Sequence, residues 1–573
     1  MDSETAFLYP QVKMTKQNSQ VHGFNDNWPR HRLDLWIIGA VLIALVVVAP
    51  LISVLWIAFH PTENIWPHLL DSVLPRYLGN TLILMAGVAV LTAVFGASSA
   101  WLVAMYRFPG RQWLDYALLF PLAIPAYVGA YALVDFLDYA GPLQSGLRAT
   151  FGWQDARDYW FLQVRAPGPA IVVLASALYP YVYLLARAAF REQSGSSYEV
   201  ARALGAGPWA LFWRVGLPLA RPAIATGVAL AMMETVADYG TVLHFGVQTL
   251  TTGVFSTWLS GNNAGGAAQI AGVILLVILL LLGLERIGRR NARFHGVSRG
   301  TRPIAPLPIR GKRAWVATLF CLLPFGMGFV LPVGVMLMQS AKRPEVWLAP
   351  GLASAFANTV MVGGTAALLT VLAAVFLVYG TRMMGRTVAR FVLPVTALGY
   401  AAPGAVLALG LLIPLAALDH RVADGVLWLT GVDPGLLITG TSAAIVVAYF
   451  VRFFGIAQGA LDAAFGRVSP SLPMAARSLG RTAGGALRDV YLPMMRGSVA
   501  TALLVVFVDC VKELPATLLL RPFNFNTLST RVFELASLER LGEAAPAALL
   551  VMAVGLAAVA VLAHANRARI ISD

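Results

Sequence analysis

Long apolar runs recur along the whole chain and limit the folds open to it. A helix needs roughly 20 mostly apolar residues to cross about 30 Å of hydrocarbon, and it satisfies its own backbone hydrogen bonds in lipid. A membrane barrel would show short segments of alternating hydrophobicity instead. We therefore predict an all-α integral membrane protein with about 12 spans, six in each half. The candidate spans are 35–59, 78–105, 114–136, 170–189, 222–239, 267–284, 314–338, 359–379, 391–415, 436–454, 497–518 and 545–563.

Basic residues indicate which side of the membrane each loop occupies. The formal charge is +14, yet only 12% of residues are charged, and the Lys and Arg residues cluster beside alternate apolar ends. This positive-inside pattern explains the charge without a nucleic-acid partner. The densest cluster, 286–313, is predicted to be a cytosolic linker between a first repeat, 35–285, and a second repeat, 314–565. A lipid-binding or nucleic-acid-binding tail is the alternative for this cluster. The arm 1–34 and the tail 566–573 are also predicted to be cytosolic.

One polar-edged segment occurs twice. The first surface segment, 199–218, has a second version at 474–493, and six positions recur at unchanged spacing. Repetition at so many fixed spacings indicates that the chain consists of two homologous halves. In the predicted orientation both segments face the cytosol. The recurring residues are Ala201, Arg202, Leu204, Gly205, Leu217 and Pro218, which reappear as Ala476, Arg477, Leu479, Gly480, Leu492 and Pro493.

Shorter matches extend the repeat into the predicted spans. Both halves run in the same direction across the membrane, so an axis along the membrane normal should relate them, and a transport pathway is expected between them. The matched residues are Asn80-Thr81 with Asn358-Thr359, Pro125 with Pro403, Val128 with Val406, and Thr249-Leu250 with Thr527-Leu528.

The first surface segment resembles a known motif. Glu199, Ala201, Gly205, Leu217 and Pro218 fit Glu-x-Ala-x-x-x-Gly, nine residues, an aliphatic residue, any residue and Leu-Pro. This pattern resembles the cytoplasmic coupling motif in the membrane subunits of ATP-binding-cassette importers. The resemblance implies a type I permease fold and a short helix that docks on a soluble ATPase. Gly205 would allow a sharp turn, and Pro218 would end the surface segment. An interfacial helix that merely joins two spans is the alternative.

The ATPase implied by this resemblance is expected to be a separate protein. The sequence contains no Gly-x-x-x-x-Gly-Lys-Ser/Thr phosphate loop, so it has no means of cradling ATP in that way. The resemblance implies two copies of a cytosolic ATPase subunit, which would hold ATP-Mg. No catalytic residue and no resident cofactor are therefore expected in this chain.

The second surface segment departs from the motif, because Met474 stands where Glu199 stands in the first. An acidic residue in a first helical turn favours the helix dipole and can accept a partner's positive charge, whereas Met can do neither. We therefore predict asymmetric docking, with the stronger polar contact at Glu199. An ordinary solvated acid is the alternative.

The stretches that follow each surface segment carry a narrower resemblance. Residues 234–241 and 509–524, together with 120–128, resemble the fused two-half permeases of bacterial ferric-iron importers. The resemblance covers nearly everything from Leu35 onward. It implies a multi-pass protein of the bacterial inner membrane with both termini in the cytosol. Its substrate would be iron(III), delivered by a periplasmic or extracellular binding protein.

Other substrates and another class of transporter are alternatives. Permeases for thiamine, phosphonate, sulfate and polyamines share the surface motif. A proton-coupled secondary transporter could also use intramembrane acids and parallel repeats, but it would not need two cytosolic docking helices.

Four acids in the predicted spans are candidates for the substrate pathway. Counted from each Leu-Pro, Glu234 corresponds to Asp509 and Asp238 to Glu513. The i, i+4 spacing places each pair on one face of a helix. Ionisable residues inside a membrane cost about 2.5 to 3.5 kcal/mol each on insertion scales, and hard oxygen ligands suit iron(III). We hypothesise that the four acids form a transient metal site or outer gate. Pairing of Glu513 with Lys512, or solvation of a helix end, is the alternative.

Overall fold

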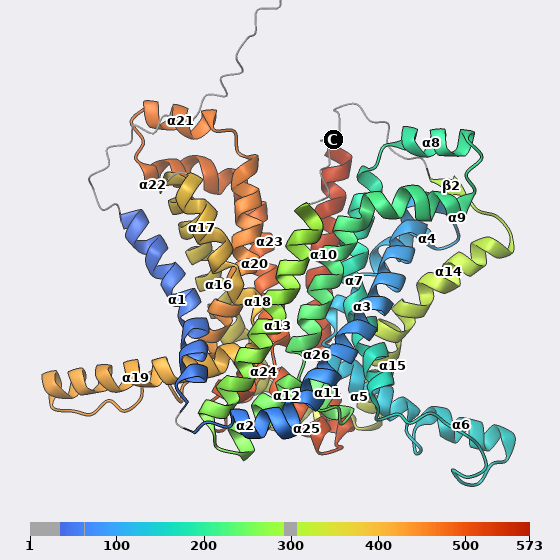
Figure 1. Cartoon of the computed structure of the whole chain (residues 1–573), viewed down its shortest axis with the longest axis horizontal. Coiled ribbons are helices and arrows are strands. Elements are labelled where there is room, and N and C mark those ends of the chain that lie inside the picture. The colour runs from blue at the N-terminus through green and yellow to red at the C-terminus, as the bar shows by residue number, and fades with distance from the viewer. Residues whose placement is uncertain (1–34, 62, 291–305, 385, 573) are drawn as a thin grey trace, which may run out of the picture.

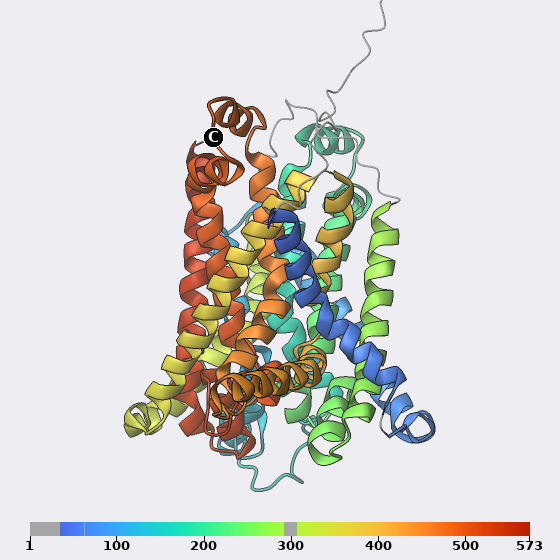
Figure 2. The ribbon, with the colours of Figure 1, turned by 90° about the vertical axis from the view of Figure 1, so that its left-hand side faces the viewer.

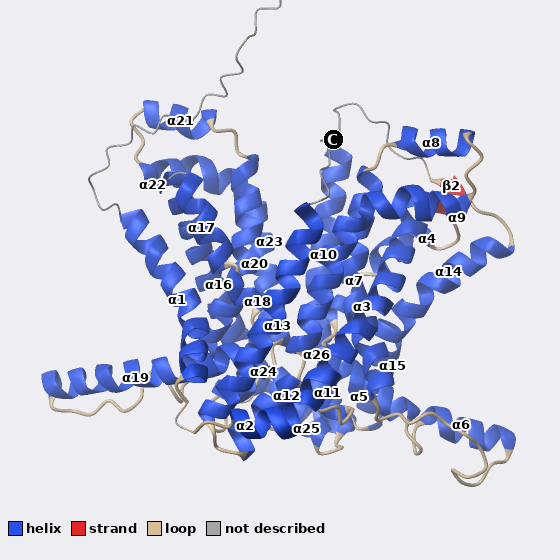
Figure 3. Cartoon of the chain, viewed as in Figure 1, coloured by secondary structure: helices blue, strands red, loops and turns tan. Residues whose placement is uncertain are grey.

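The chain folds into a bundle of long helices (Figures 1 and 3). The computed structural model describes residues 35–61, 63–290, 306–384 and 386–572. Within these residues, 11 helices are long and apolar enough to cross a membrane, or up to 12 if one sharply bent pair is counted as a span. The prediction of an all-α membrane protein is confirmed. The N-terminal arm, 1–34, and the linker residues 291–305 lie outside the described residues.

The first half contains the elements up to α13. They are α1 (Leu35–Phe59), α2 (Trp66–His68), η1 (Leu69–Val73), α3 (Leu74–Met105), β1 (Tyr106–Arg107), α4 (Arg111–Ala117), η2 (Phe120–Ala123), α5 (Ala126–Leu137), α6 (Pro142–Phe151), α7 (Pro167–Glu192), α8 (Gly195–Ala203), α9 (Pro208–Leu211), η3 (Phe212–Gly216), α10 (Leu217–Ala237), α11 (Gly240–His244), α12 (Leu250–Phe255), η4 (Ser256–Ser260) and α13 (Ala264–Arg290).

The second half begins with a short strand, β2, which pairs in parallel with β1 and so holds the end of the linker against the first half. Its elements are β2 (Leu307–Pro308), α14 (Lys312–Phe325), η5 (Gly326–Val330), α15 (Leu331–Lys342), η6 (Pro344–Leu348), α16 (Leu352–Met384), α17 (Arg386–Thr396), α18 (Leu398–Ala401), α19 (Gly404–Thr430), α20 (Ser442–Arg467), α21 (Ser471–Ser478), α22 (Ala483–Ala486), η7 (Leu487–Tyr491), α23 (Leu492–Lys512), α24 (Pro515–Leu520), α25 (Leu528–Ser537) and α26 (Leu541–Ser572).

The first spanning helix of each half packs against the other half. Helix α1 lies against α16 and α19, and α15 lies against α5. The approach of α1 to α16 is close, because a Cβ added at Gly39 would lie 2.4 Å from a ring carbon of Phe376. The two sequence repeats are therefore interleaved in space rather than folded as separate bodies. In Figure 2, α1 (blue) crosses the face that the second half presents to the viewer.

The third candidate span of each half, 114–136 and 391–415, is interrupted by a helix break instead of forming one continuous helix. The segments Arg111–Ala123 and Ala126–Phe151 meet at 95°. Pro125 and Pro403 have extended backbone at the start of α5 and α19, respectively. Proline lacks an N–H and disfavours helical backbone at the residue before it, which explains why the matched prolines mark both breaks.

Helix α20 starts six residues later than the predicted span 436–454, at Ser442. The apolar residues before it do not continue the helix, because Gly435 and Gly440 have positive φ angles of 66° and 79°. These residues form a chain segment that runs back beside α19. Hydrophobicity alone did not separate this segment from the span.

The matched Asn-Thr pairs hold the loops that follow the broken helices. The Thr81 hydroxyl accepts the Leu250 N–H at 3.1 Å, and the Thr359 hydroxyl accepts the Leu528 N–H at 2.8 Å. The Asn80 amide donates to the Gln248 carbonyl in the same way that Asn358 donates to Asn526. The repeat in sequence is thus a repeated clamp between the second span and the start of α12 or α25.

We expect Thr81→Val and Thr359→Val each to lower the free energy of unfolding by about 1–3 kcal/mol, because a buried backbone N–H loses its acceptor. Thermal unfolding in detergent would measure the loss. Thr150→Val is the control, since the Thr150 hydroxyl is exposed and bonds only within its own helix. Equal stability of all three variants would contradict the clamp.

Candidate functional site

Helix breaks surround a cavity of about 140 Å³ between the two halves. Three of the breaks line it directly, at Ile124-Pro125, at Asp238-Tyr239 and at Glu513-Leu514. The fourth, before α19, lies beside it, because a Cβ at Gly404 would meet Glu513 at 2.3 Å. Discontinuous helices are the usual way for a membrane protein to present backbone and polar groups to a cargo. Its charged and hydroxyl-bearing lining residues are Tyr127, Tyr181, Glu234, Asp238, Tyr239, Tyr400, Arg452, Asp509, Lys512 and Glu513.

The second acid of each predicted pair lies just beyond the end of its spanning helix. Helix α10 ends at Ala237 and α23 ends at Lys512. The expectation that both acids share one face of a spanning helix is therefore wrong. Asp238 and Glu513 have extended backbone instead, and each turns back to cap the short helix that follows.

The two caps are closely matched. Asp238 accepts the N–H groups of Thr241 at 3.0 Å and Val242 at 3.1 Å. Glu513 accepts those of Ala516 and Thr517, both at 3.1 Å. A carboxylate at a helix N-terminus satisfies donors that the helix itself leaves open and interacts favourably with its dipole. These two acids thus stabilise the breaks that form the cavity.

Two cations also reach this cavity, and their pairing differs from the sequence-based alternative. Lys512 pairs with Asp509 at 3.0 Å, not with Glu513, and donates to the Leu122 carbonyl at 3.1 Å. Glu513 pairs with Arg452 of α20 at 3.1 Å, and both side chains are largely buried. Each acid of the second half therefore has its own cation.

Glu234 is in a different situation. It makes no ion pair with any residue that the structure describes, and the Tyr400 hydroxyl donates to its carboxylate at 3.4 Å. Glu234 and Asp509, which are equivalent in the repeat, line the same cavity from opposite halves. Glu234 is therefore the one acid of the four that, among the described residues, has neither an ion pair nor a helix cap.

A closed metal site is not present in the described part of the chain. No three His, Cys, Asp or Glu side chains among those residues lie together in a way that could hold a metal ion. The four predicted acids border one cavity, but two of them cap helices and a third is paired with Lys512.

Sequence reasoning missed Arg452 and Tyr400. Neither has a polar counterpart in the first half, so the repeat gave no signal for them. A different signal was present for Arg452, because a lone arginine inside a predicted span is costly and usually functional. In the structure its side chain is largely buried and pairs with Glu513.

The two surface segments lie at the same end of the molecule, where α8 and α21 cap the two halves (Figure 1). Gly205 and Gly480 have φ angles of 83° and 84°, so the predicted sharp turn is confirmed in both copies. The leucines just before them, Leu204 and Leu479, have 83% and 84% of their surface exposed. The two copies therefore present an equivalent apolar side chain beside the same turn.

Two details of the surface segments differ from expectation. Pro218 does not end the segment, because the chain is helical on both sides of it and a π-helical turn, Phe212–Gly216, precedes it. Pro493 follows a similar turn, Leu487–Tyr491. Proline cannot donate the backbone hydrogen bond of a regular helix, and the wider π-helical turn tolerates its absence. Glu199 lies in the second turn of α8, so the argument from the helix dipole does not apply to it.

The fold and the paired surface segments are those of a permease. Residues 92–293 match the family described as binding-protein-dependent transport system inner membrane component. The chain belongs to this family, whose members are type I permease subunits of ATP-binding-cassette importers. It is therefore a multi-pass transport subunit, as the sequence indicated.

Three relatives differ in the cargo that their names state and in how much of this chain they match. The Fe(3+)-transport system permease protein FbpB 2 of Haemophilus influenzae is 27% identical over 488 residues, which cover 83% of this chain and 87% of the relative. The probable sulfate transport system permease protein cysT of Nephroselmis olivacea is 30% identical over 36% of this chain and 72% of its own length. The molybdenum transport system permease protein ModB of Escherichia coli is 28% identical over 36% of this chain and 92% of its own length. The first match spans both halves, which confirms the fused two-half organisation.

We expect Glu513→Ala to destabilise the protein more than Asp238→Ala. Both variants lose a helix cap, worth about 0.5–2 kcal/mol, but only Glu513→Ala also leaves the buried Arg452 without its carboxylate, a loss of about 3–5 kcal/mol. Thermal unfolding of the purified protein would measure both. Asp238→Asn is the control, because an amide oxygen can still accept the two N–H bonds. Equal losses would show that Arg452 finds another partner.

Proposed function

We propose that this chain is the membrane permease of an iron(III) importer. An external binding protein delivers the cargo, the chain alternates access to the cavity, and two ATPase subunits drive the change. The end that carries α8 and α21 faces the cytosol, and the end that carries α12 and α25 faces outward. The observation that carries the substrate assignment is the acid-lined cavity in a chain whose match to an Fe(3+)-transport permease extends over 83% of its length.

Glu234 and Asp509 are the proposed contacts for the passing cation. They lie on the two halves at one cavity, so relative motion of the halves changes the separation of their carboxylates. Glu234 supplies charge that no described ion pair neutralises, while Asp509 can exchange Lys512 for cargo. Oxygen ligands from two sides favour a hard cation but leave most of its coordination open, which suits onward release. Asp238 and Glu513 act indirectly, by holding the helix breaks.

An oxyanion is the second candidate cargo. Arg452 and Lys512 both reach the cavity, and the sulfate and molybdenum permeases are also relatives. Both cations are engaged by carboxylates in this structure, which favours the cation as cargo.

The docking of the ATPase is proposed to rest on packing at both surface segments and on charge at one. Leu204 and Leu479 are exposed at equivalent turns, and each fits an apolar groove on a partner. Glu199 is also exposed and can accept a positive charge, whereas Met474 offers only apolar contact. The two ATPase subunits would thus be held unequally.

We expect Leu204→Glu and Leu479→Glu to reduce co-purification of the ATPase and ATP-driven transport, because each places a charge in an apolar contact. Leu259→Glu, on a similarly exposed leucine of η4 at the opposite end, is the matched control and should bind the ATPase normally. Glu199→Met should weaken binding by about fivefold, the effect of roughly 1 kcal/mol. Met474→Ala should have a smaller effect. Identical losses for Glu199→Met and Met474→Ala would contradict unequal docking.

The substrate is tested by reconstitution with the ATPase and the binding protein, followed by uptake of labelled iron, sulfate, molybdate and thiamine. We expect iron uptake, and a decrease of at least about tenfold in Glu234→Gln, corresponding to about 1.4 kcal/mol of lost stabilisation for the passing cation. Asp238→Asn is the control and should retain most uptake. Transport of sulfate, molybdate or thiamine without iron would overturn the assignment.

A further inference from the structure

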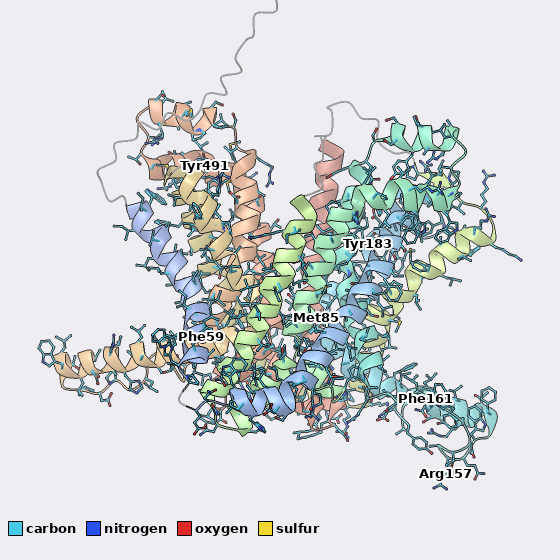
Figure 4. The ribbon with its side chains drawn as sticks, viewed as in Figure 1. Phe59, Met85, Arg157, Phe161, Tyr183 and Tyr491 are labelled. Carbon is cyan, nitrogen blue, oxygen red and sulfur yellow. The ribbon has the colours of Figure 1, made fainter. Side chains whose placement is uncertain are left out.

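Each half carries a hairpin that projects sideways from the bundle. The first wing, 138–166, consists of α6 and the segment that returns to α7. The second wing, 412–441, consists of the outer part of α19 and the segment that returns to α20. The wings point in opposite directions at the end away from α8 and α21 (Figure 1). In the stick view the first wing is marked by Arg157 and Phe161 (Figure 4).

The wings are ordered by their own hydrogen bonds. In the second wing the buried carboxylate of Asp419 accepts the N–H groups of Leu437, Ile438 and Thr439 at 2.8, 3.0 and 2.7 Å. These bonds fix the returning segment against α19. The wing therefore has a defined shape without any partner.

A similar network ties the first wing together. The Gln144 amide donates to the Leu137 carbonyl at 2.7 Å, and the Tyr159 hydroxyl donates to Gln144 at 2.6 Å. Arg148 then donates to the Tyr159 hydroxyl at 2.9 Å and to the Tyr139 carbonyl at 2.8 Å.

The second wing exposes an apolar stripe. Leu415, Leu418, Val422, Val426 and Leu429 recur at intervals of three and four residues and so form one stripe along the helix. Leu418 and Leu429 have 49% and 74% of their surface exposed. This apolar face is therefore left partly uncovered by the protein.

The opposite side of the same helix is mixed. His420, Arg421 and Asp424 are exposed there, together with the apolar side chains of Ile413, Leu427 and Trp428. Both wings also expose a tryptophan, Trp160 at 87% and Trp428 at 84%. Tryptophan is enriched where a protein meets the boundary between lipid and water.

The second wing leaves the bundle beside the spanning part of α1. Helix α19 crosses α1 at Pro50, since a Cβ at Gly410 would lie 2.1 Å from the Pro50 carbonyl oxygen. Pro50 precedes the end of α1 at Phe59 by nine residues, or about 14 Å of helix. The wing therefore starts before the end of α1 rather than beyond it.

The first wing leaves the bundle nearer the end of its supporting helices. Helix α5 meets α15 at Pro332, where a Cβ on Gly129 would lie 3.9 Å from the proline ring. The two helices run parallel from there, since the Gln339 amide donates to Asp135 at 2.9 Å. Asp138, where the wing begins, is therefore level with the end of α15 at Lys342.

We propose that both wings lie in the headgroup layer of the leaflet at this end, the outer leaflet in the orientation proposed above, with their apolar faces against lipid. An amphipathic helix in the membrane plane buries its apolar face about 5–10 Å into the boundary region. The N-terminal ends of α5 and α19 border the cavity, so the wings tie the helices of the cavity to the leaflet. This inference depends on the membrane fold and holds whatever the cargo is.

The test uses spin labels on single introduced cysteines in the full chain. Leu418→Cys and Leu429→Cys report on the apolar stripe, and Asp424→Cys is the matched control on the opposite side of the helix. The native thiols, Cys321 and Cys510, are buried, and the unsubstituted chain measures their background. The protein is reconstituted in vesicles of phosphatidylethanolamine and phosphatidylglycerol, and collisions with oxygen are compared with collisions with a water-soluble nickel chelate.

We expect a severalfold higher ratio of oxygen to nickel collisions at positions 418 and 429 than at position 424. Equal access of the nickel chelate to all three labels would overturn the proposal. Lipid-exposed labels with no transport of iron would contradict the proposed substrate but not the wings. Labels open to the chelate in vesicles and shielded only after addition of the iron-loaded binding protein would show that the wings receive a protein, and would also overturn the proposal.

Discussion

Backbone groups freed by a helix break have no water to bond to inside a membrane, and this constraint shapes the centre of the molecule. An unsatisfied polar group in hydrocarbon costs several kcal/mol, so irregular backbone survives there only with partners. Asp238 and Glu513 supply those partners for the helices that restart after α10 and α23. The cavity between the halves exists because these breaks are stable. Asp238 and Glu513, which look like cargo ligands in the sequence, are thus first of all structural groups.

The two halves share the structural devices and differ in the groups that face the cavity. The caps, the threonine clamps, the prolines at the breaks and the glycines of the surface turns all occur twice. Arg452 occurs once, and its counterpart positions in the first half are apolar. Two arginines across so small a cavity would repel each other strongly at low dielectric. A fused chain allows one half to carry both cations, Arg452 and Lys512. The other half carries Glu234, which makes no ion pair among the described residues, and a symmetric pair of identical subunits could not divide these groups in this way.

Interleaving couples the motions of the two repeats. Because α1 packs on the second half and α15 on the first, neither repeat can move as a unit without carrying a helix that belongs to the other in sequence. The wings extend this frame outward from α5 and α19. In the proposed arrangement, the lipid leaflet supports α5 and α19, whose breaks lie at the cavity. The ATPase subunits act on the surface segments at the other end.

The sequence by itself determined the membrane class, the two-half repeat, the exposed surface segments and the four acids that border the cavity. These follow from patterns that are local or exactly repeated: apolar length, positive charge, and fixed spacings around glycine and proline. Only the tertiary structure decided which acids are already engaged, since a cap on the next helix or a pair with Arg452 depends on where the chain bends. It also decided that the apolar residues before Ser442 run back along α19. Hydrophobicity indicates that a residue is removed from water. Whether that residue belongs to a spanning helix or to a lateral hairpin depends on the neighbours that the fold brings to it.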